Sequence, residues 1–417
     1  MDRPNIILIM PDQQRADSLG CYGNSFTVTP NLDRLAEGGV RFTRAFTNWP
    51  VCTPARGTMW TGMYPTAHGL IENVYGIDDA FKEHAKVRTT MFHLMKAAGY
   101  TTAHFGKWHM GDAKPDYFDV WEASFNSRVN HWVGQVDSGK YRPTLQTDFA
   151  VDFIHSRKPG DAPFLMVQGF YPPHDPYTAP QRFYEHYRNR GVPFAGYYAA
   201  VTALDYEVGR MLDALEDSRQ RDNTVIIYFS DHGDTFLYRE DGEHKFVCFD
   251  DSILIPFIVS WPKGLPAGRV SAQTVTLADL LPTVVALGGG KSPAGLHGRD
   301  ILPAARAQAA DWPDHVYIQT RTHKRKLNQR CYRTDAWKLI GSLDGPHSLY
   351  DLARDPEEEF DLFDTPRPDP MSRFLNEPSH AGTARELAHK LKAEAARLDD
   401  PQGVAIADQV LAALAGR

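Results

Sequence analysis

The stretch from Cys52 to Arg56, Cys-Thr-Pro-Ala-Arg, combines residue types that can bind an anion and attack it. Pro54 suits the first turn of a helix, where its missing N–H costs nothing. Cys52 and Arg56 then lie four residues apart, on one face of that helix. A helix start supplies free N–H groups and positive potential, and arginine adds a planar donor fork that fits a sulfuryl or phosphoryl group. The spacing predicts an anion site beside a cysteine; the alternative is a cysteine simply buried before a helix.

The composition narrows the class of protein. A chain of 417 residues can hold one large domain and a smaller one, because a single core stops growing at about 250–300 residues. The formal net charge of −7 argues against a nucleic-acid partner. Four scattered cysteines are too few for a disulfide framework, and we find neither a secretory leader nor a membrane span. We therefore expect a cytoplasmic protein without membrane contact, whose oligomeric state the sequence does not indicate.

The chain alternates between strand and helix patterns. Short apolar runs without polar alternation, typical of buried parallel strands, occupy residues 6–10, 101–105, 164–167 and 225–229. Helix signals lie between them, at 29–39 and at about 197–215. After about residue 310, short strands and turns precede two charged helical stretches near 385–398 and 405–414. We predict an α/β fold with a large, mostly parallel sheet flanked by helices over residues 1–310, and a smaller α+β subdomain over 311–417.

Polar side chains directly follow each of the four predicted strands. In a parallel sheet the carboxyl ends share one edge, and ligands bind in the crevice outside that edge. We therefore expect the four segments to converge on one site. Its candidate residues are Asp12 and Gln13 after the first strand, Lys107 and His109 after the second, His174 after the third, and Asp231 and His232 after the fourth.

Two of these residues, Asp12 and Asp231, close strands that we predict to be neighbours. Carboxylates brought together at a buried edge repel each other unless a cation or a proton lies between them. A divalent metal ion is the natural solution. The alternative is that both are strand-end or helix-capping carboxylates exposed to water.

The chain resembles the formylglycine-dependent sulfatases of the alkaline phosphatase superfamily over nearly its whole length. The matching segments follow one another in the family's order along the chain. They are residues 5–12, 29–33, the pentapeptide 52–56, 61–62, 106–109, 173–177, 230–233, Lys245 ahead of 255–256, 337–340, 349–352 and 355–357. In that family a maturation enzyme oxidises the cysteine to formylglycine, whose hydrate carries two hydroxyls on one carbon. One hydroxyl attacks sulfur, and the other then loses its proton and expels sulfate by elimination.

The resemblance implies a metal cofactor. One divalent ion, with calcium the first choice, is expected to be held by Asp12, Gln13, Asp231, His232 and an oxygen of the modified Cys52. Many sulfatases carry two acids after the first strand and Asp-Asn after the later one, so this ligand set is less charged. Because it includes an imidazole, manganese, magnesium and zinc are further candidates.

The resemblance also implies how the sulfuryl group is bound. Arg56, Lys107 and Lys245 are expected to bind its oxygens together with the metal, since preorganised charge usually supplies the largest part of catalysis. Asn73 is expected to add a hydrogen bond to the substrate. Taken singly, Lys107 could be a solvated lysine and Lys245 part of a mobile charged loop. The basic run from 321 to 330 is expected to be a solvated face, and the alternative is a face that meets the substrate.

Proton transfers are assigned by the same resemblance. Asp231 is expected to take the proton from one hydroxyl of the hydrate, and His109 to assist the later elimination. His174, with Lys245, is expected to protonate the leaving oxygen. The alternative for His174 is a histidine that merely caps a turn in a proline-rich loop.

Three functions are compatible with these residues. The leading one is a sulfuric ester hydrolase acting on a small sulfated sugar, aryl sulfate or alkyl sulfate. The same machinery acts on phosphorus in phosphonate monoester hydrolases and phosphodiesterases, but residues 106–109 resemble the sulfatases more. The third is an inactive binding protein whose Cys52 stays a thiol. The loop from 121 to 141, expected to form part of the pocket wall, carries no motif that identifies the organic half of the substrate.

Overall fold

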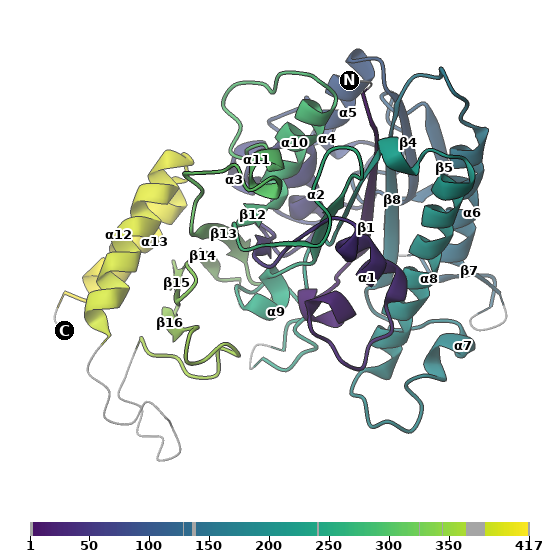
Figure 1. Ribbon diagram of the computed structural model, residues 1–417. Coiled ribbons are helices and arrows are strands. Elements are labelled where there is room, and N and C mark those ends of the chain that lie inside the picture. The colour runs from purple at the N-terminus through teal and green to yellow at the C-terminus, as the bar shows by residue number, and fades with distance from the viewer. Residues whose placement is uncertain are drawn as a thin grey trace.

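A mixed sheet forms the centre of the molecule (Figure 1). The computed structural model describes residues 3–127, 129–135, 139–239, 242–324, 326–343, 345–363 and 380–415. Within these ranges the sheet has eight strands. In spatial order they are β11 (Arg269–Ser271), β2 (Val40–Phe42), β10 (Phe257–Ser260), β9 (Thr224–Phe229), β1 (Asn5–Asp12), β8 (Phe164–Pro173), β4 (Thr101–Lys107) and β5 (Val120–Phe125).

The strands that carry the candidate site lie side by side. β9, β1, β8, β4 and β5 are parallel neighbours, whereas β10 runs antiparallel to β9 and to β2. The predicted mostly parallel sheet is therefore confirmed. Each of the four predicted strands exists and is longer than its apolar run: β1, β4 and β8 continue past the carboxyl end of the run, and β9 begins one residue earlier, at Thr224.

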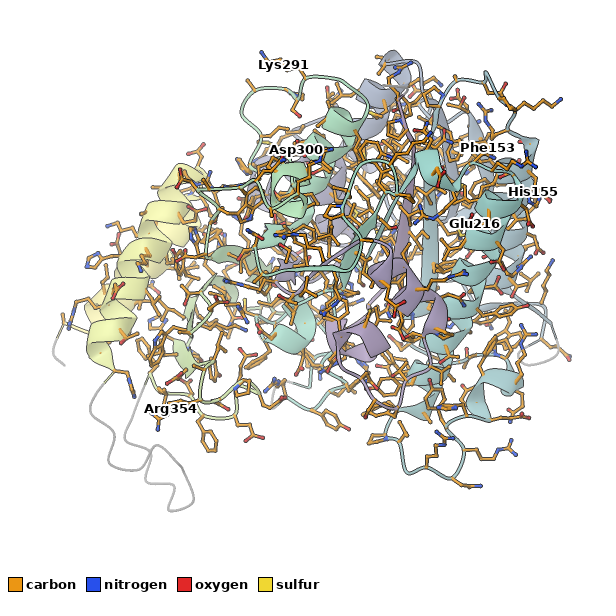
Figure 2. All side chains as sticks on the ribbon, viewed as in Figure 1. Phe153, His155, Glu216, Lys291, Asp300 and Arg354 are labelled. Carbon is orange, nitrogen blue, oxygen red and sulfur yellow. The ribbon has the colours of Figure 1, made fainter. Side chains whose placement is uncertain are left out.

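Helices cover both faces of the sheet (Figure 1). Along β1, Ile6, Leu8 and Met10 belong to one apolar cluster, and Ile7 and Ile9 to the other. Burial on both faces explains why the strand lacks polar alternation. The first cluster includes α2 (Cys52–Thr61), α5 (Met91–Ala97) and α10 (Leu280–Leu287); the second includes α1 (Pro30–Glu37), α6 (Arg142–Ser156) and α8 (Ala195–Asp217). Side chains fill the space between the layers (Figure 2).

Short elements complete this part of the chain. They are β3 (Ala45–Phe46), α3 (Pro65–His68), α4 (Ala80–Glu83), β6 (Trp132–Val133), β7 (Lys140–Tyr141), α7 (Gln181–Tyr184), α9 (Asp250–Ile253), β12 (Val275–Thr276) and α11 (Leu302–Ala305). Among the described residues, no helix combines the length and the apolar character that crossing a membrane requires.

A smaller antiparallel sheet follows toward the C-terminus. It consists of β13 (Val316–Arg321), β14 (Asn328–Arg333), β15 (Trp337–Ser342) and β16 (Ser348–Asp351). The terminal helices α12 (Ala381–Arg397) and α13 (Pro401–Ala413) pack on it through a shared apolar cluster (Figure 1). The expected α+β subdomain is thus confirmed in its architecture, while its boundary near residue 310 stays a prediction.

One residue of the basic run departs from its expected solvated face. Arg330 on β14 is 1% exposed, and its guanidinium contacts both carboxylate oxygens of Asp400, at 2.5 and 3.1 Å. Asp400 also accepts from the backbone N–H of Gly403 in the first turn of α13. This buried ion pair therefore fixes α13 to the sheet, which a run of basic residues in sequence could not reveal.

Replacing Arg330 with methionine should destabilise the protein by about 3–5 kcal/mol, because it leaves the carboxylate of Asp400 buried without its cation. Chemical denaturation followed by circular dichroism measures this change. Lys392→Met is the matched control, since its pair with Asp408 joins the two terminal helices at the surface, 2.6 Å apart. That variant should lose less than about 1 kcal/mol. Equal losses in the two variants would contradict the structural role of Arg330.

Candidate active site

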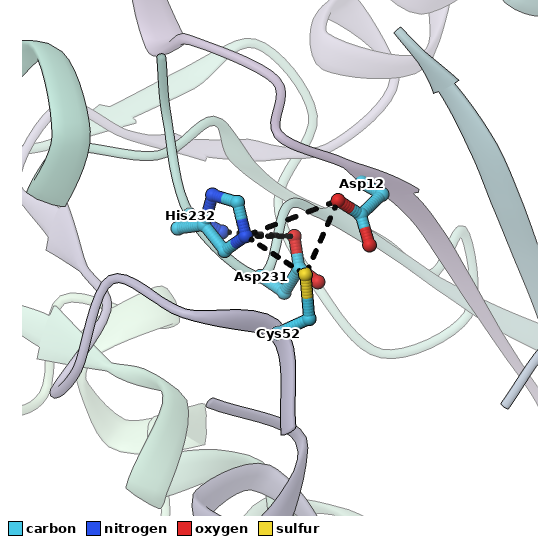
Figure 3. Close-up of side chains that lie close together, drawn as sticks. All are labelled: Asp12, Cys52, Asp231 and His232. Carbon is cyan, nitrogen blue, oxygen red and sulfur yellow. Dashed lines mark hydrogen bonds and ion pairs between the residues drawn. The ribbon is translucent and has the colours of Figure 1, made fainter. Parts of the chain in front are cut away.

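Four side chains from three distant segments meet at the carboxyl edge of the main sheet (Figure 3). Asp12 ends β1, Cys52 begins α2, and Asp231 and His232 follow β9 after one intervening residue, Ser230. All four are buried, and one polar atom from each lies within 4.8 Å of the others. Because β1 and β9 pair in parallel, the expected proximity of Asp12 and Asp231 is confirmed. The alternative, carboxylates exposed to water, is wrong, since both are 0% exposed.

The chemistry of this donor set suits a divalent cation. Nδ1 of His232 faces the carbonyl oxygen of Gly233 at 2.9 Å, and a carbonyl can only accept, so Nδ1 carries the proton. Nε2 therefore presents its lone pair toward Cys52 Sγ, 3.3 Å away, and toward one oxygen each of Asp12 and Asp231, both 3.8 Å away. Imidazole and carboxylate are common ligands of divalent metals, and a hydrogen bond to the second ring nitrogen orients such a histidine.

Gln13 lies beside this cluster in a constrained conformation. Its φ of 65° is in the left-handed region, and its backbone N–H donates to Asp231 Oδ1 at 3.1 Å. Its side chain accepts from Lys245 Nζ at 2.8 Å and donates to Asp234 Oδ2 at 2.6 Å. Gln13 thus orients one carboxylate of the cluster and one lysine. Its expected role as a metal ligand stays a prediction.

Arg56 has the position that its sequence spacing predicts, and its partners are the two carboxylates of the cluster. It lies on the same face of α2 as Cys52, and its guanidinium donates to Asp12 Oδ2 and Asp231 Oδ2, both at 3.1 Å, and to the carbonyl of Lys107 at 2.8 Å. The side chain is 0% exposed. Arg56 therefore holds the two carboxylates in place, and its expected role in binding the sulfuryl oxygens stays a prediction.

Two lysines converge on the sulfur of Cys52. Lys245 Nζ lies 3.4 Å and Lys107 Nζ 3.7 Å from Sγ, and Lys107 also donates to Asp12 Oδ2 at 2.6 Å. Both lysines are buried, so the alternatives of a solvated lysine and a mobile charged loop are wrong. Burial and Asp12 raise the pKa of the Cys52 thiol, but Lys107, Lys245 and His232 outweigh them and lower it. The position is therefore built to stabilise negative charge.

The two candidate histidines have different environments. His174 places Nε2 3.0 Å from Lys245 Nζ, while Nδ1 lies 3.1 Å from Asp175 Oδ1. Burial and then Lys245 lower the pKa of His174. His109 is buried, and neither ring nitrogen has a hydrogen-bond partner among the described residues. Because buried polar groups normally have partners, an unpaired imidazole next to the cluster is consistent with a group that meets a ligand.

Asn73 contacts the helix that carries Cys52. Its side-chain oxygen accepts from the backbone N–H of Thr53 at 3.0 Å, in the first turn of α2. The hydroxyl of Thr53 in turn donates to the carbonyl of His109 at 3.0 Å. Asn73 therefore helps to place the start of α2, and its expected contact with the substrate stays a prediction.

Two supporting residues were not anticipated from the sequence. Asp234 accepts from Gln13, from the hydroxyl of Tyr177 at 2.6 Å and from the backbone of Phe236 at 2.8 Å. The ring of Tyr171 lies 4.3 Å from Lys107 Nζ, in a cation–π contact. Asp234 could have been suspected because it follows Asp231 at a strand end. No pattern in the sequence marks Tyr171, since its role depends on β8 lying beside β4.

Comparisons with known proteins agree with this geometry. Residues 4–290 match the family model described as Sulfatase, and residues 242–383 match that described as N-sulphoglucosamine sulphohydrolase, C-terminal. The chain is 30% identical to the uncharacterized sulfatase YidJ of Escherichia coli (strain K12), over 87% of this chain and 84% of that one. It is 28% identical to an ulvan-active sulfatase of Formosa agariphila, over 95% of this chain and 82% of that one.

Solved structures share the fold. BT4656 in complex with its substrate D-glucosamine-2-N,6-O-disulfate has a TM-score of 0.80 at 22% identity, covering 96% of this chain and 99% of that one. The phosphonate monoester hydrolase of Agrobacterium radiobacter has a TM-score of 0.76 at 20% identity, covering 95% and 96%. At these identities the likeness concerns the fold alone. The family match, the curated relatives and the buried cysteine site together show that the chain belongs to the sulfatase family of the alkaline phosphatase superfamily and is a sulfuric ester hydrolase.

Proposed function

We propose that this enzyme removes sulfate from a sulfated sugar, using a formylglycine made from Cys52 and one bound divalent metal ion. The observation that carries the proposal is the convergence of two buried lysines and two buried carboxylates on the sulfur of Cys52. The sugar is supported by relatives: one is named an ulvan-active sulfatase, and the substrate of BT4656 is a disulfated glucosamine.

Asp12, Asp231 and His232 would hold the metal, together with Gln13 and the modified side chain at position 52. When bound, the ion would supply positive charge next to the sulfate oxygens and to the attacking hydroxyl. We place calcium first because of the oxygen ligands, with manganese, magnesium and zinc as alternatives. A formylglycine-generating enzyme would be the required partner in maturation.

The surrounding side chains divide the remaining tasks. Lys107 and Lys245 would bind the oxygens of the sulfuryl group, since both amines lie close to position 52. His174 would protonate the leaving oxygen of the sugar, because its Nε2 lies next to Lys245 at the site. Asp231 would accept a proton from the hydrate, and His109, with its unpaired ring, would assist sulfate release.

A paired assay tests this function. The protein is produced together with a formylglycine-generating enzyme, and peptide mass spectrometry measures the conversion of Cys52. The matured protein is then offered sulfated monosaccharides, an aryl sulfate and an aryl phosphonate. We expect conversion of Cys52 and release of sulfate, with a sulfated sugar as the best substrate. Faster cleavage of the phosphonate would show that the protein is a phosphonate monoester hydrolase. An inactive protein whose Cys52 stays unmodified would indicate a binding protein.

Removing the metal should abolish turnover. Dialysis of the matured enzyme against a chelator is expected to lower kcat by at least about 100-fold, because the buried carboxylates and the substrate would lose their common cation. Metal analysis before dialysis identifies the ion, and adding back calcium, manganese, magnesium or zinc singly shows which restores activity. A chelated, metal-free protein with full activity would overturn the metal assignment.

A further inference from the structure

Lys245 has to be positioned without the help of a regular element. The segment from 242 to 249 lies between β9 and α9 and consists of bends and irregular backbone. The amine of Lys245 nevertheless lies 3.4 Å from Cys52 Sγ and 3.0 Å from His174 Nε2. A flexible loop would spread this lysine over many positions, so other contacts must fix the backbone beside it.

The next residue, Phe246, has an unusual conformation. Its φ is 74°, a left-handed value that costs free energy for a bulky side chain and persists only where surrounding contacts enforce it. Three contacts do so. Its N–H donates to the carbonyl of Pro50 at 3.1 Å, its carbonyl accepts from the hydroxyl of Thr320 at 3.0 Å, and its ring lies 5.2 Å from the ring of His323.

These contacts come from two different parts of the molecule. Pro50 precedes the cysteine by two residues, so it belongs to the segment that carries the nucleophile. Thr320 lies on β13, in the C-terminal sheet, and is 0% exposed. The peptide units on the two sides of Phe246 are therefore held by the catalytic part and by the C-terminal subdomain respectively.

A second attachment holds the far end of the same segment. Lys338 on β15 donates to the carbonyl of Cys248 at 2.9 Å and to Asp250 Oδ1 at 2.6 Å, and it lies 2.5 Å from Glu358 Oε1. Glu358 in turn accepts from the backbone N–H of Asp250 at 2.7 Å. Lys338 and Glu358 are buried, so this attachment is shielded from water.

We propose that the C-terminal sheet is a positioning element for Lys245, and that Thr320 is the positioning residue through which it acts. This inference rests on the proposed function, in which Lys245 serves the sulfate ester. Thr320 acts by fixing the carbonyl of Phe246, the residue that follows the lysine. A displacement of about 1 Å in a catalytic group can cost about 100-fold in rate, so one hydroxyl at this place has a measurable effect.

Thr320→Val removes the hydroxyl and keeps the shape of the side chain. We expect kcat to fall about tenfold or more, with a smaller rise in KM, because Lys245 binds the sulfuryl oxygens in the ground state and more strongly in the transition state. Thr320→Ser restores the hydroxyl and should recover most of kcat. The matched control is Thr322→Val, since Thr322 is also buried but accepts from Leu327 within the same subdomain, at 2.9 Å. Thr322→Val should keep the wild-type kcat, even where its melting temperature falls as much as that of Thr320→Val.

A double-mutant cycle shows whether Thr320 acts through the lysine. In a Lys245→Met background, Thr320→Val should reduce the residual kcat by less than about twofold, because the group that it positions is gone. If Thr320→Val and Thr322→Val have equal effects on kcat, or if the loss from Thr320→Val is the same in both backgrounds, the positioning role is overturned although the enzyme is a sulfatase.

Binding of inorganic sulfate separates this inference from the proposed function. Calorimetry on the full-length protein should give weaker sulfate binding for Thr320→Val than for Thr322→Val. If the wild-type protein hydrolyses no sulfate ester, the proposed function fails; the positioning role then stands when this difference in sulfate affinity is seen and falls when it is absent.

Discussion

Cys52→Ala should abolish sulfate-ester hydrolysis, by at least about 10⁴-fold in kcat, without unfolding the protein. The substitution removes the atom from which the nucleophile would be made. Only a small side chain is lost, so the free energy of unfolding should change by no more than about 2 kcal/mol. Asp12 still neutralises Lys107 at 2.6 Å, so the lysine is not left unpaired. Sulfate release measures the activity, and thermal unfolding measures the stability.

The control for this variant is another buried cysteine outside the site. Cys331 on β14 is 0% exposed and belongs to an apolar cluster of the C-terminal sheet. Cys331→Ala should lower stability by a similar amount but leave turnover near the wild-type value. Residual activity of Cys52→Ala above about 1% of wild type would remove Cys52 as the nucleophile. A collapse in melting temperature typical of a large core deletion would show that its role is structural.

Lys107→Met should lower kcat/KM about 10³-fold, since it removes one of the two lysine cations that face position 52. Burial lowers the pKa of Lys107, but Asp12 and Cys52 outweigh burial and raise it, so the amine is charged at neutral pH. Methionine keeps an apolar stem of similar length beside Tyr171. Asp12 keeps its hydrogen bond from Arg56 at 3.1 Å, so the carboxylate remains partnered. Steady-state kinetics with a sulfate ester measures the loss.

A surface lysine provides the comparison for this second variant. Lys140 forms a similar ion pair, 2.5 Å from Asp148, but its side chain is 49% exposed. Lys140→Met should therefore leave kcat/KM and stability almost unchanged. If Lys107→Met retains near-normal turnover while circular dichroism shows a normal fold, Lys107 does not bind the sulfuryl group.

The position of Arg56 shows that a sequence motif does not by itself give the partners of a side chain. The spacing from Cys52 to Arg56 places both side chains on one face of α2, as expected. That face, however, meets the ends of β1 and β9, where the guanidinium of Arg56 donates hydrogen bonds to Asp12 and Asp231. Helical periodicity gives the direction of a side chain, but the partner it meets depends on which strand ends lie opposite.

The sequence by itself determined the fold class and the membership of the candidate site. Apolar runs without alternation indicated strands buried on both faces, and the polar residues after each run indicated one shared edge, because parallel strands place their carboxyl ends together. Both inferences depend on local patterns, which are encoded by neighbouring residues. This is why Asp12, Lys107, His174 and Asp231 could be assigned to one site from their places in the chain alone.

Only the tertiary structure decided how these residues are held. The burial of Arg330 against Asp400, the contact of Tyr171 with Lys107 and the fixing of Phe246 by Thr320 each join segments far apart in the chain. Such contacts require particular distances and angles between interacting groups, and no periodic pattern encodes them. The segment that carries Lys245 is the clearest case, because its irregular backbone takes its conformation from the two parts of the molecule that contact it.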